Sequence, residues 1–153
     1  MKKKKKKKLN CVIDTMVLRK ANAKIDTAPR ESSQFQKRIN LLILLASGEM
    51  TVLYSERLIT EYQQQVQEPR NDFVKAFLEL LTHTTSQPNW DENWTVNKQK
   101  ARHCRFPPED DHVLRTAIHP DGSTIFSEED RMLVTDACIH RTLDVHVKAP
   151  PGI

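Results

Sequence analysis

Short apolar runs alternate with longer amphipathic stretches along this chain. The apolar runs are LNCVIDTMVL near the amino terminus, TVLY at 51–54, STIFS at 123–127 and LDVHV at 143–147. The first three runs are too short for helices and rich in apolar and β-branched residues, which is typical of strands buried in a parallel sheet. The last run alternates apolar and polar residues, and it also predicts a strand.

Helices are predicted between these strands. Apolar stripes at helical spacing cover 34–47, 56–69, 71–83 and 130–142, and a helix with an acidic first turn covers 110–118. Gly48 follows the first of these helices as a C-cap, and Ser55 precedes the second as an N-cap. Residues 19–33 predict a short helix or turn followed by a loop, and 84–108 predict an irregular segment with a brief strand at Val96.

Strands that alternate with helices predict an α/β domain with three layers, α/β/α, and a mainly parallel central sheet. The 153 residues suit one domain, which we place at 9–153. A content of 38% hydrophobic and 29% charged residues excludes a disordered chain. No apolar run approaches the ~20 residues of a membrane span, so we expect no membrane association.

Charge is concentrated at the amino terminus. Seven consecutive lysines at 2–8 predict a disordered tail over 1–8, which would attract phosphates without reading sequence. A solubilising tail with no specific role explains the run equally simply. Without these lysines the remainder carries a net charge of −3.

The cysteines and histidines give no sign of a zinc site. Cys11, Cys104 and Cys138 are odd in number and have no CxxC spacing, and the six histidines show no HxxxH spacing. We therefore expect reduced thiols and a cytoplasmic location.

Acidic residues recur near the predicted strand ends, where ligands bind in open α/β sheets. They are Asp14, Glu61, Asp110, Asp111 and Asp130. Helix capping, first-turn acids or solvent exposure explains each of them singly. Together at one rim they would repel one another unless a hard cation such as Mg²⁺ or Mn²⁺ lay among them. Two such ions about 4 Å apart support phosphodiester hydrolysis.

The order of these motifs resembles that of the PIN-domain nucleases over almost the whole chain. The motifs are VIDTMVL with Asp14, VLYSERLITEY with Glu61, FPPEDDHVLRTAI with Asp110 and IFSEEDRML with Asp130. The third is closest to the form found in PIN proteins described as toxin components. The fourth departs from the family, because Ser127-Glu128-Glu129 replaces its usual polar residue and glycine.

The resemblance implies a ribonuclease dependent on Mg²⁺ or Mn²⁺. Asp14, Glu61, Asp110 and Asp130 would be the catalytic and metal-binding acids, with Asp111 as the alternative to Asp110. Thr15 and Ser127 would be polar groups near the metals. The resemblance also implies RNA as substrate, a toxin–antitoxin module with an antitoxin protein as partner, and a homodimer.

Neighbouring side chains could contact the substrate. His112 and Arg115 are candidates for holding its phosphates, although surface exposure explains them as simply. Trp90 and Trp94 could stack on bases or anchor their segment to the core.

Three alternatives remain open at this point. One is a catalytically inactive PIN-like module that binds nucleic acid or acts as a scaffold. Another is a different doubly wound fold, such as a receiver-like domain, although the sequence offers no convincing lysine at a strand end. The third is cleavage of DNA, by analogy with flap-type nucleases.

Overall fold

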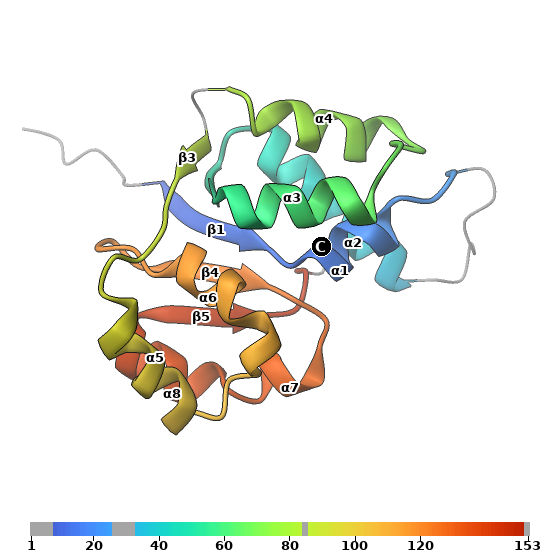
Figure 1. Ribbon diagram of the computed structural model, residues 1–153. Coiled ribbons are helices and arrows are strands. Elements are labelled where there is room, and N and C mark those ends of the chain that lie inside the picture. Colours follow the sequence, from blue (N-terminus) through green and yellow to red (C-terminus); the bar gives the residue numbers. More distant parts are fainter. Residues whose placement is uncertain (1–7, 26–32, 84–85, 152–153) are drawn as a thin grey trace, which may run out of the picture.

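Five parallel strands form the central sheet of the computed structural model, which describes residues 8–25, 33–83 and 86–151 (Figure 1). In sheet order they are β3 (Ser86–Pro88), β2 (Met50–Tyr54), β1 (Leu9–Ile13), β4 (Ser123–Phe126) and β5 (Val145–Lys148). All four neighbouring pairs run parallel. The predicted α/β/α architecture with a parallel sheet is therefore confirmed.

The helices divide between the two halves of the sheet. Around β1 and β2 lie α1 (Thr15–Ala21), α2 (Ser33–Ala46), α3 (Glu56–Gln65) and α4 (Asp72–Leu80) (Figure 1). Around β4 and β5 lie α5 (Trp94–His103), the short 3₁₀ helix η1 (Pro108–Asp110), α6 (Asp111–Ala117), α7 (Asp130–Leu133) and α8 (Asp136–Leu143). Among the described helices, none is both long and apolar enough to cross a bilayer.

The sequence pattern explains the central strand and the start of α3. Residues Cys11, Val12 and Ile13 have no exposed surface, as expected for a strand covered on both faces. The predicted N-cap Ser55 is confirmed, because its Oγ accepts a hydrogen bond of 3.3 Å from the amide of Leu58. The register of β1 with β4 places Ile13 beside Phe126, so the residues that follow these two strands meet at one edge of the sheet.

Some predicted elements differ from the structure. The segment at 84–108 contains β3 and α5, and Val96 lies in α5, so the brief strand predicted there is wrong. Only Asn97 and Ala101 of α5 are buried. The sequence of this helix therefore shows little apolar periodicity and did not predict a helix. The helix expected at 130–142 is broken into α7 and α8, where Thr135 donates its hydroxyl to the carbonyl of Met132. The lysine tail falls largely on residues 1–7 and so lies outside the described residues, as does the part of the predicted loop at 26–32. In the described part of 19–33, α1 continues from Thr15 to Ala21, so the short helix expected there begins earlier than predicted.

A disulfide joins Cys104 to Cys138, so the expectation of three reduced thiols is wrong. Cys104 follows α5 and Cys138 lies on α8, and the packing of these helices brings the two Cα atoms to 5.5 Å. The two cysteines are 34 residues apart with no recognisable spacing motif, so the sequence alone could not indicate the pair. Cys11 is free and buried in β1.

Candidate active site

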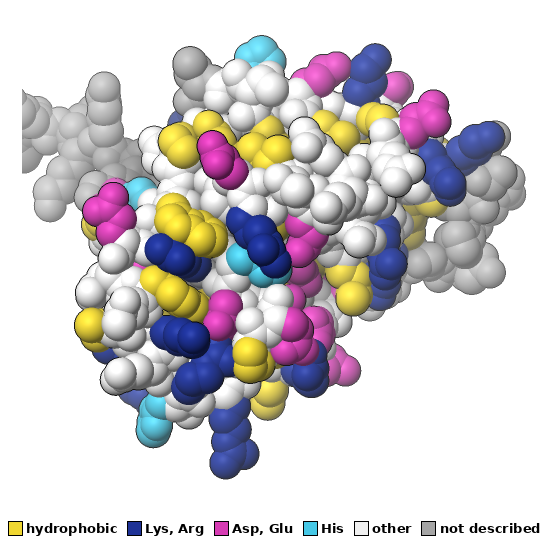
Figure 2. Space-filling view, viewed as in Figure 1, with side chains coloured by type: hydrophobic (Ala, Val, Ile, Leu, Met, Phe, Trp, Pro, Cys, Tyr) yellow, Lys and Arg dark blue, Asp and Glu magenta, His cyan; other side chains and the backbone are white. Residues whose placement is uncertain are grey.

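A cavity of about 280 Å³ lies at the carboxyl end of β1, and four carboxylates line it. They belong to the residue after β1, to α3, to the end of η1 and to the loop after β4, and they are Asp14, Glu61, Asp110 and Glu129. Figure 2 shows the acidic side chains as a band below α3 on this face of the molecule. The fold therefore collects acids from distant parts of the chain in one place.

Asp14 is held in the cavity wall by the sheet. Its backbone amide donates to the carbonyl of Phe126 at 3.0 Å, and its side chain is only 5% exposed. Although Asp14 occupies the N-cap position of α1, its carboxylate makes no capping hydrogen bond. It accepts a hydrogen bond of 2.9 Å from the Ser127 hydroxyl instead. Burial raises the pKa of Asp14 to about 6, which the Ser127 hydrogen bond partly opposes and the charge of Glu61 reinforces.

Glu61 is held by one polar contact on each carboxylate oxygen. The Thr15 hydroxyl donates to Oε1, and Nε2 of His112 lies 2.7 Å from Oε2. The contact with His112, followed by the Thr15 hydrogen bond, lowers the pKa of Glu61 against the opposing effect of burial. Glu61 therefore contributes a negative charge to the cavity at neutral pH.

Asp110 presents an unsatisfied oxygen. Its Oδ2 is buried and has no hydrogen-bond partner among the described residues, and its side chain makes no capping hydrogen bond to α6. Burial and the charges of Asp14 and Glu129 together raise the pKa of Asp110 to about 7. A buried oxygen without a donor, beside other carboxylates, fits a site for a cation.

The three consecutive acids after β4 have three different environments. Glu128 points to α2, where its Oε2 lies 2.5 Å from Nε of Arg38 and both side chains are 12% exposed. Glu129 lines the cavity, and its backbone amide donates to Oγ of Ser127 at 3.1 Å. Asp130 is exposed at the start of α7 and does not line the cavity. The carboxylate supplied by this loop is therefore Glu129, one residue before the predicted Asp130.

Glu129 also belongs to a group of three acids that could hold a metal ion. Glu109, Asp110 and Glu129 each offer a carboxylate oxygen, and these oxygens lie within 4.8 Å of one another. Glu109 is exposed, contacts the guanidinium of Arg131 and does not itself line the cavity.

The third motif offered two candidate acids, Asp110 and Asp111, and they lie in different places in the structure. Asp110 lines the cavity, whereas Asp111 pairs with Arg102 and lines a different hollow, of about 400 Å³. This second hollow also contains His112 and Arg115.

The other predicted site residues lie around the acids in different roles. Thr15 lines the cavity, whereas Ser127 is fully buried behind Asp14 and supports the wall rather than facing a substrate. His112 contacts Glu61. Arg115 donates from Nε to the Asp91 carbonyl at 2.9 Å, outside the acid cavity.

Besides Met16, the cavity residues that were not predicted from the sequence are Glu129, Arg19, Gln64 and Gln65. Helical spacing could have found three of them, because Arg19 is four residues after Thr15, and Gln64 and Gln65 are three and four residues after Glu61. No comparable signal distinguishes Glu129 from its two acidic neighbours, because that choice depends on the loop conformation.

The donor set is made of carboxylate oxygens, with the hydroxyl of Thr15 beside them. Hard divalent cations such as Mg²⁺ and Mn²⁺ prefer such oxygen ligands, and they keep part of their water shell. A bound cation would give Oδ2 of Asp110 a partner. It would also lower the raised pKa values of Asp14 and Asp110 by favouring the charged carboxylates. The residues present therefore fit such an ion.

Comparison of the chain with models of protein families, with curated proteins and with solved structures finds no match.

Proposed function

We propose that this protein is a ribonuclease that hydrolyses RNA phosphodiester bonds with the help of Mg²⁺ or Mn²⁺. The observation that carries the proposal is the convergence of Asp14, Glu61, Asp110 and Glu129 on one cavity. Three of these acids, Asp14, Glu61 and Asp110, are the ones that the resemblance to the PIN-domain nucleases implies. Glu129 takes the place that the sequence motif suggested for Asp130.

The proposed ion would be held by Asp110 and Glu129, whose carboxylate oxygens lie within 4.8 Å of each other, and by Asp14 in the same cavity, with Glu61 completing the negative wall. A divalent cation bound there would supply the positive charge that metal-assisted phosphodiester hydrolysis requires. Ser127 keeps Asp14 directed into the cavity, and Thr15 and His112 fix the carboxylate of Glu61. Arg19, at the rim, is placed to contact a substrate phosphate.

The resemblance extends the proposal to a toxin whose activity is blocked by an antitoxin that covers the acidic rim. This role, the homodimer and the cytoplasmic location stay predictions. The alternative proposal is an inactive PIN-like module that only binds nucleic acid. It differs from the nuclease in requiring no divalent ion.

The test is to measure RNA cleavage and Mn²⁺ binding by the parent protein and by Asp14→Asn. Loss of the Asp14 charge should lower cleavage by ~100-fold or more, because metal-assisted catalysis is worth several kcal/mol. It should also weaken Mn²⁺ binding, measured by calorimetry or electron paramagnetic resonance. Circular dichroism should be unchanged, because asparagine keeps an oxygen for the Ser127 hydroxyl.

Asp72→Asn is a matched control, because Asp72 is exposed at the start of α4 and does not line the cavity. It should behave as the parent in both measurements. Cleavage that persists undiminished in EDTA, or the absence of Mn²⁺ binding, would contradict the proposal. RNA binding that depends on salt, without any cleavage, would favour the alternative.

A further inference from the structure

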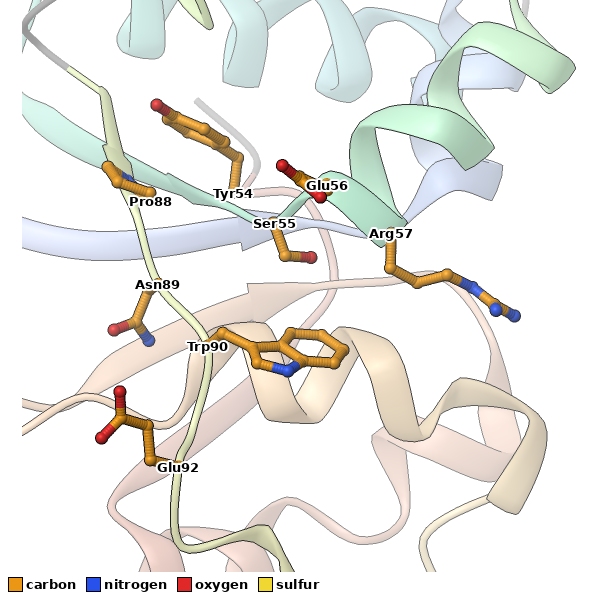
Figure 3. Close-up of a pocket in the computed structure, with 8 residues that line it drawn as sticks. All are labelled: Tyr54, Ser55, Glu56, Arg57, Pro88, Asn89, Trp90 and Glu92. Carbon is orange, nitrogen blue, oxygen red and sulfur yellow. The ribbon is translucent and has the colours of Figure 1, made fainter.

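A further hollow, of about 830 Å³ and here called the Trp90 hollow, lies next to the carboxyl end of β2 (Figure 3). Its walls include Tyr54 and Ser55 at the end of that strand, Arg57 at the start of α3, and Trp90 in the segment between β3 and α5. Figure 3 shows the rings of Tyr54 and Trp90 on opposite sides of Ser55. Nothing in the proposed cleavage chemistry uses this hollow.

Trp90 has an unusual environment for a tryptophan. It is 40% exposed, and the guanidinium carbon of Arg115 lies 4.2 Å from its ring centroid. Arg115 is fixed by its hydrogen bond to the carbonyl of Asp91, so the cation–π contact holds the indole in place. The indole therefore presents a large aromatic surface that is held in one orientation and is still exposed to solvent.

A chain of neighbouring residues connects this hollow with the acid cavity. Trp90 and Arg57 also line the hollow of about 400 Å³ that contains His112. Nε2 of His112 in turn lies 2.7 Å from Oε2 of Glu61, which lines the acid cavity. Figure 2 shows basic and hydrophobic side chains alternating on this face, with acidic side chains beside them. Arg57 and His112 therefore lie between the Trp90 indole and the acids.

The charges around Trp90 favour stacking over simple attraction of phosphates. Arg57 and Arg115 are near the indole of Trp90. Two acids, Glu56 and Glu92, also line the Trp90 hollow. The local charge is therefore close to neutral. A base can stack on an indole only when it is exposed, as in a single strand, because bases in a duplex are stacked on one another.

We propose that the Trp90 hollow binds a nucleobase of single-stranded RNA, and that the strand then passes Arg57 and His112 to reach the acids. This inference rests on the proposed function for its direction, and it names single-stranded RNA as the substrate. The stacking itself requires no metal and no cleavage, so it can be tested separately.

The experiment uses the full chain in EDTA, where cleavage is suppressed, with a fluorescein-labelled single-stranded oligoribonucleotide and the matching duplex. Binding is measured by anisotropy for the parent, Trp90→Ala and Trp90→Phe. Trp90→Ala should weaken single-strand binding ~5- to 100-fold, because one stacked base is worth about 1–3 kcal/mol. Trp90→Phe should stay within about 3-fold of the parent, since it keeps an aromatic face. The lysine tail is the same in all variants, so its contribution cancels.

A second measurement reports on the ring itself. The chain has two tryptophans, so Trp94→Phe leaves Trp90 as the only one. Its fluorescence should be quenched by the single strand and not by the duplex. Arg141→Gln, which removes an exposed guanidinium from α8 away from the three hollows, is the charge control and should bind as the parent.

The outcomes separate this inference from the proposed function. Unchanged binding by Trp90→Ala, absence of quenching, equal affinity for the duplex, or no RNA binding by the parent would each overturn the stacking site. Stacking without any metal-dependent cleavage would refute the nuclease and leave the binding site standing.

Discussion

The hydroxyl of Ser127 donates a hydrogen bond of 2.9 Å to Oδ2 of Asp14, and the two residues follow the neighbouring strands β4 and β1. The same hydroxyl oxygen accepts a hydrogen bond of 3.1 Å from the amide of Glu129. One fully buried serine therefore connects two acids of the cavity. It stabilises the charged form of Asp14 and fixes the loop that carries Glu129.

Ser127→Ala should lower RNA cleavage by ~10- to 100-fold, the range found when supporting partners of metal ligands are removed. Loss of the donor should also raise the pKa of Asp14 further, so activity should require a higher pH than in the parent. A pH–rate profile measures both effects. Ser123→Ala is the matched control, because it removes a buried hydroxyl at the other end of β4 that donates to the carbonyl of Ala117. The control should lower stability without moving the pH profile, and an equal displacement in both variants would contradict the assigned role of Ser127.

Glu129 and Asp130 are adjacent acids that should behave differently. Glu129→Gln removes a carboxylate from the cavity and should lower both cleavage and Mn²⁺ affinity by ~10-fold or more. Asp130→Asn changes an exposed residue at the start of α7 and should leave both within about 2-fold of the parent. Cleavage rates and calorimetric Mn²⁺ titrations of the two variants make the comparison. The reverse pattern would show that the sequence motif, rather than the cavity geometry, identifies the ligand.

The metal-free protein should lose stability as the pH rises. The pKa of Asp14 is raised to about 6 and that of Asp110 to about 7, so the folded state holds protons that the unfolded chain releases near pH 4. Their contribution is complete below pH 4 and is lost as the pH passes through 6 and 7. The melting temperature in EDTA should therefore be ~5 °C or more lower at pH 8 than at pH 5. The pKa of Glu61 is lowered, so its ionised carboxylate stabilises the folded state. This contribution is lost only when the pH falls below the ordinary glutamate pKa of 4.5, outside the range from pH 5 to pH 8.

Replacing both Asp14 and Asp110 by asparagine is the control for this pH dependence. The double variant should show a flatter dependence of melting temperature on pH, because the two titrations are gone. In the parent, Mn²⁺ should raise the melting temperature more at pH 8 than at pH 5, since protons compete with the ion for the carboxylates. If the melting temperature of the double variant depended on pH as steeply as that of the parent, groups other than Asp14 and Asp110 would be its cause.

The disulfide between Cys104 and Cys138 should stabilise the half of the domain that contains α5 and α8. It spans 34 residues, and closure of such a loop is worth about 3–4 kcal/mol. Reduction, or Cys104→Ser, should lower the melting temperature by roughly 10 °C. Calorimetry with and without reductant measures the difference, and the Cys104→Ser variant should not respond to reductant. Three free thiols in the untreated folded protein would contradict the pairing.

The sequence by itself determined the alternation of strands and helices and the position of the first acid. Buried strands in a parallel sheet need continuous apolar residues, and the run CVI at 11–13 meets that condition. Because the run ends at Asp14, the local pattern alone located the strand and placed this carboxylate at the carboxyl edge of the sheet. Glu61 and the pair Asp110 and Asp111 were indicated by their places relative to strands and helix starts, together with the order of motifs that resembles the PIN-domain nucleases. Helix α5 and strand β3 were not, because a polar helix with few buried residues and a three-residue edge strand leave almost no periodic signal.

Only the tertiary structure decided which acid of each group faces the cavity. Glu128, Glu129 and Asp130 are chemically near-equivalent in sequence, but Arg38 binds the first, the Ser127 turn directs the second inward and α7 exposes the third. Asp110 and Asp111 are separated in the same way, because Arg102 binds Asp111. The disulfide also depends on helices packed from distant parts of the chain. Local patterns fix which backbone elements form, whereas side-chain direction and long-range pairing depend on partners that meet only after the chain has folded.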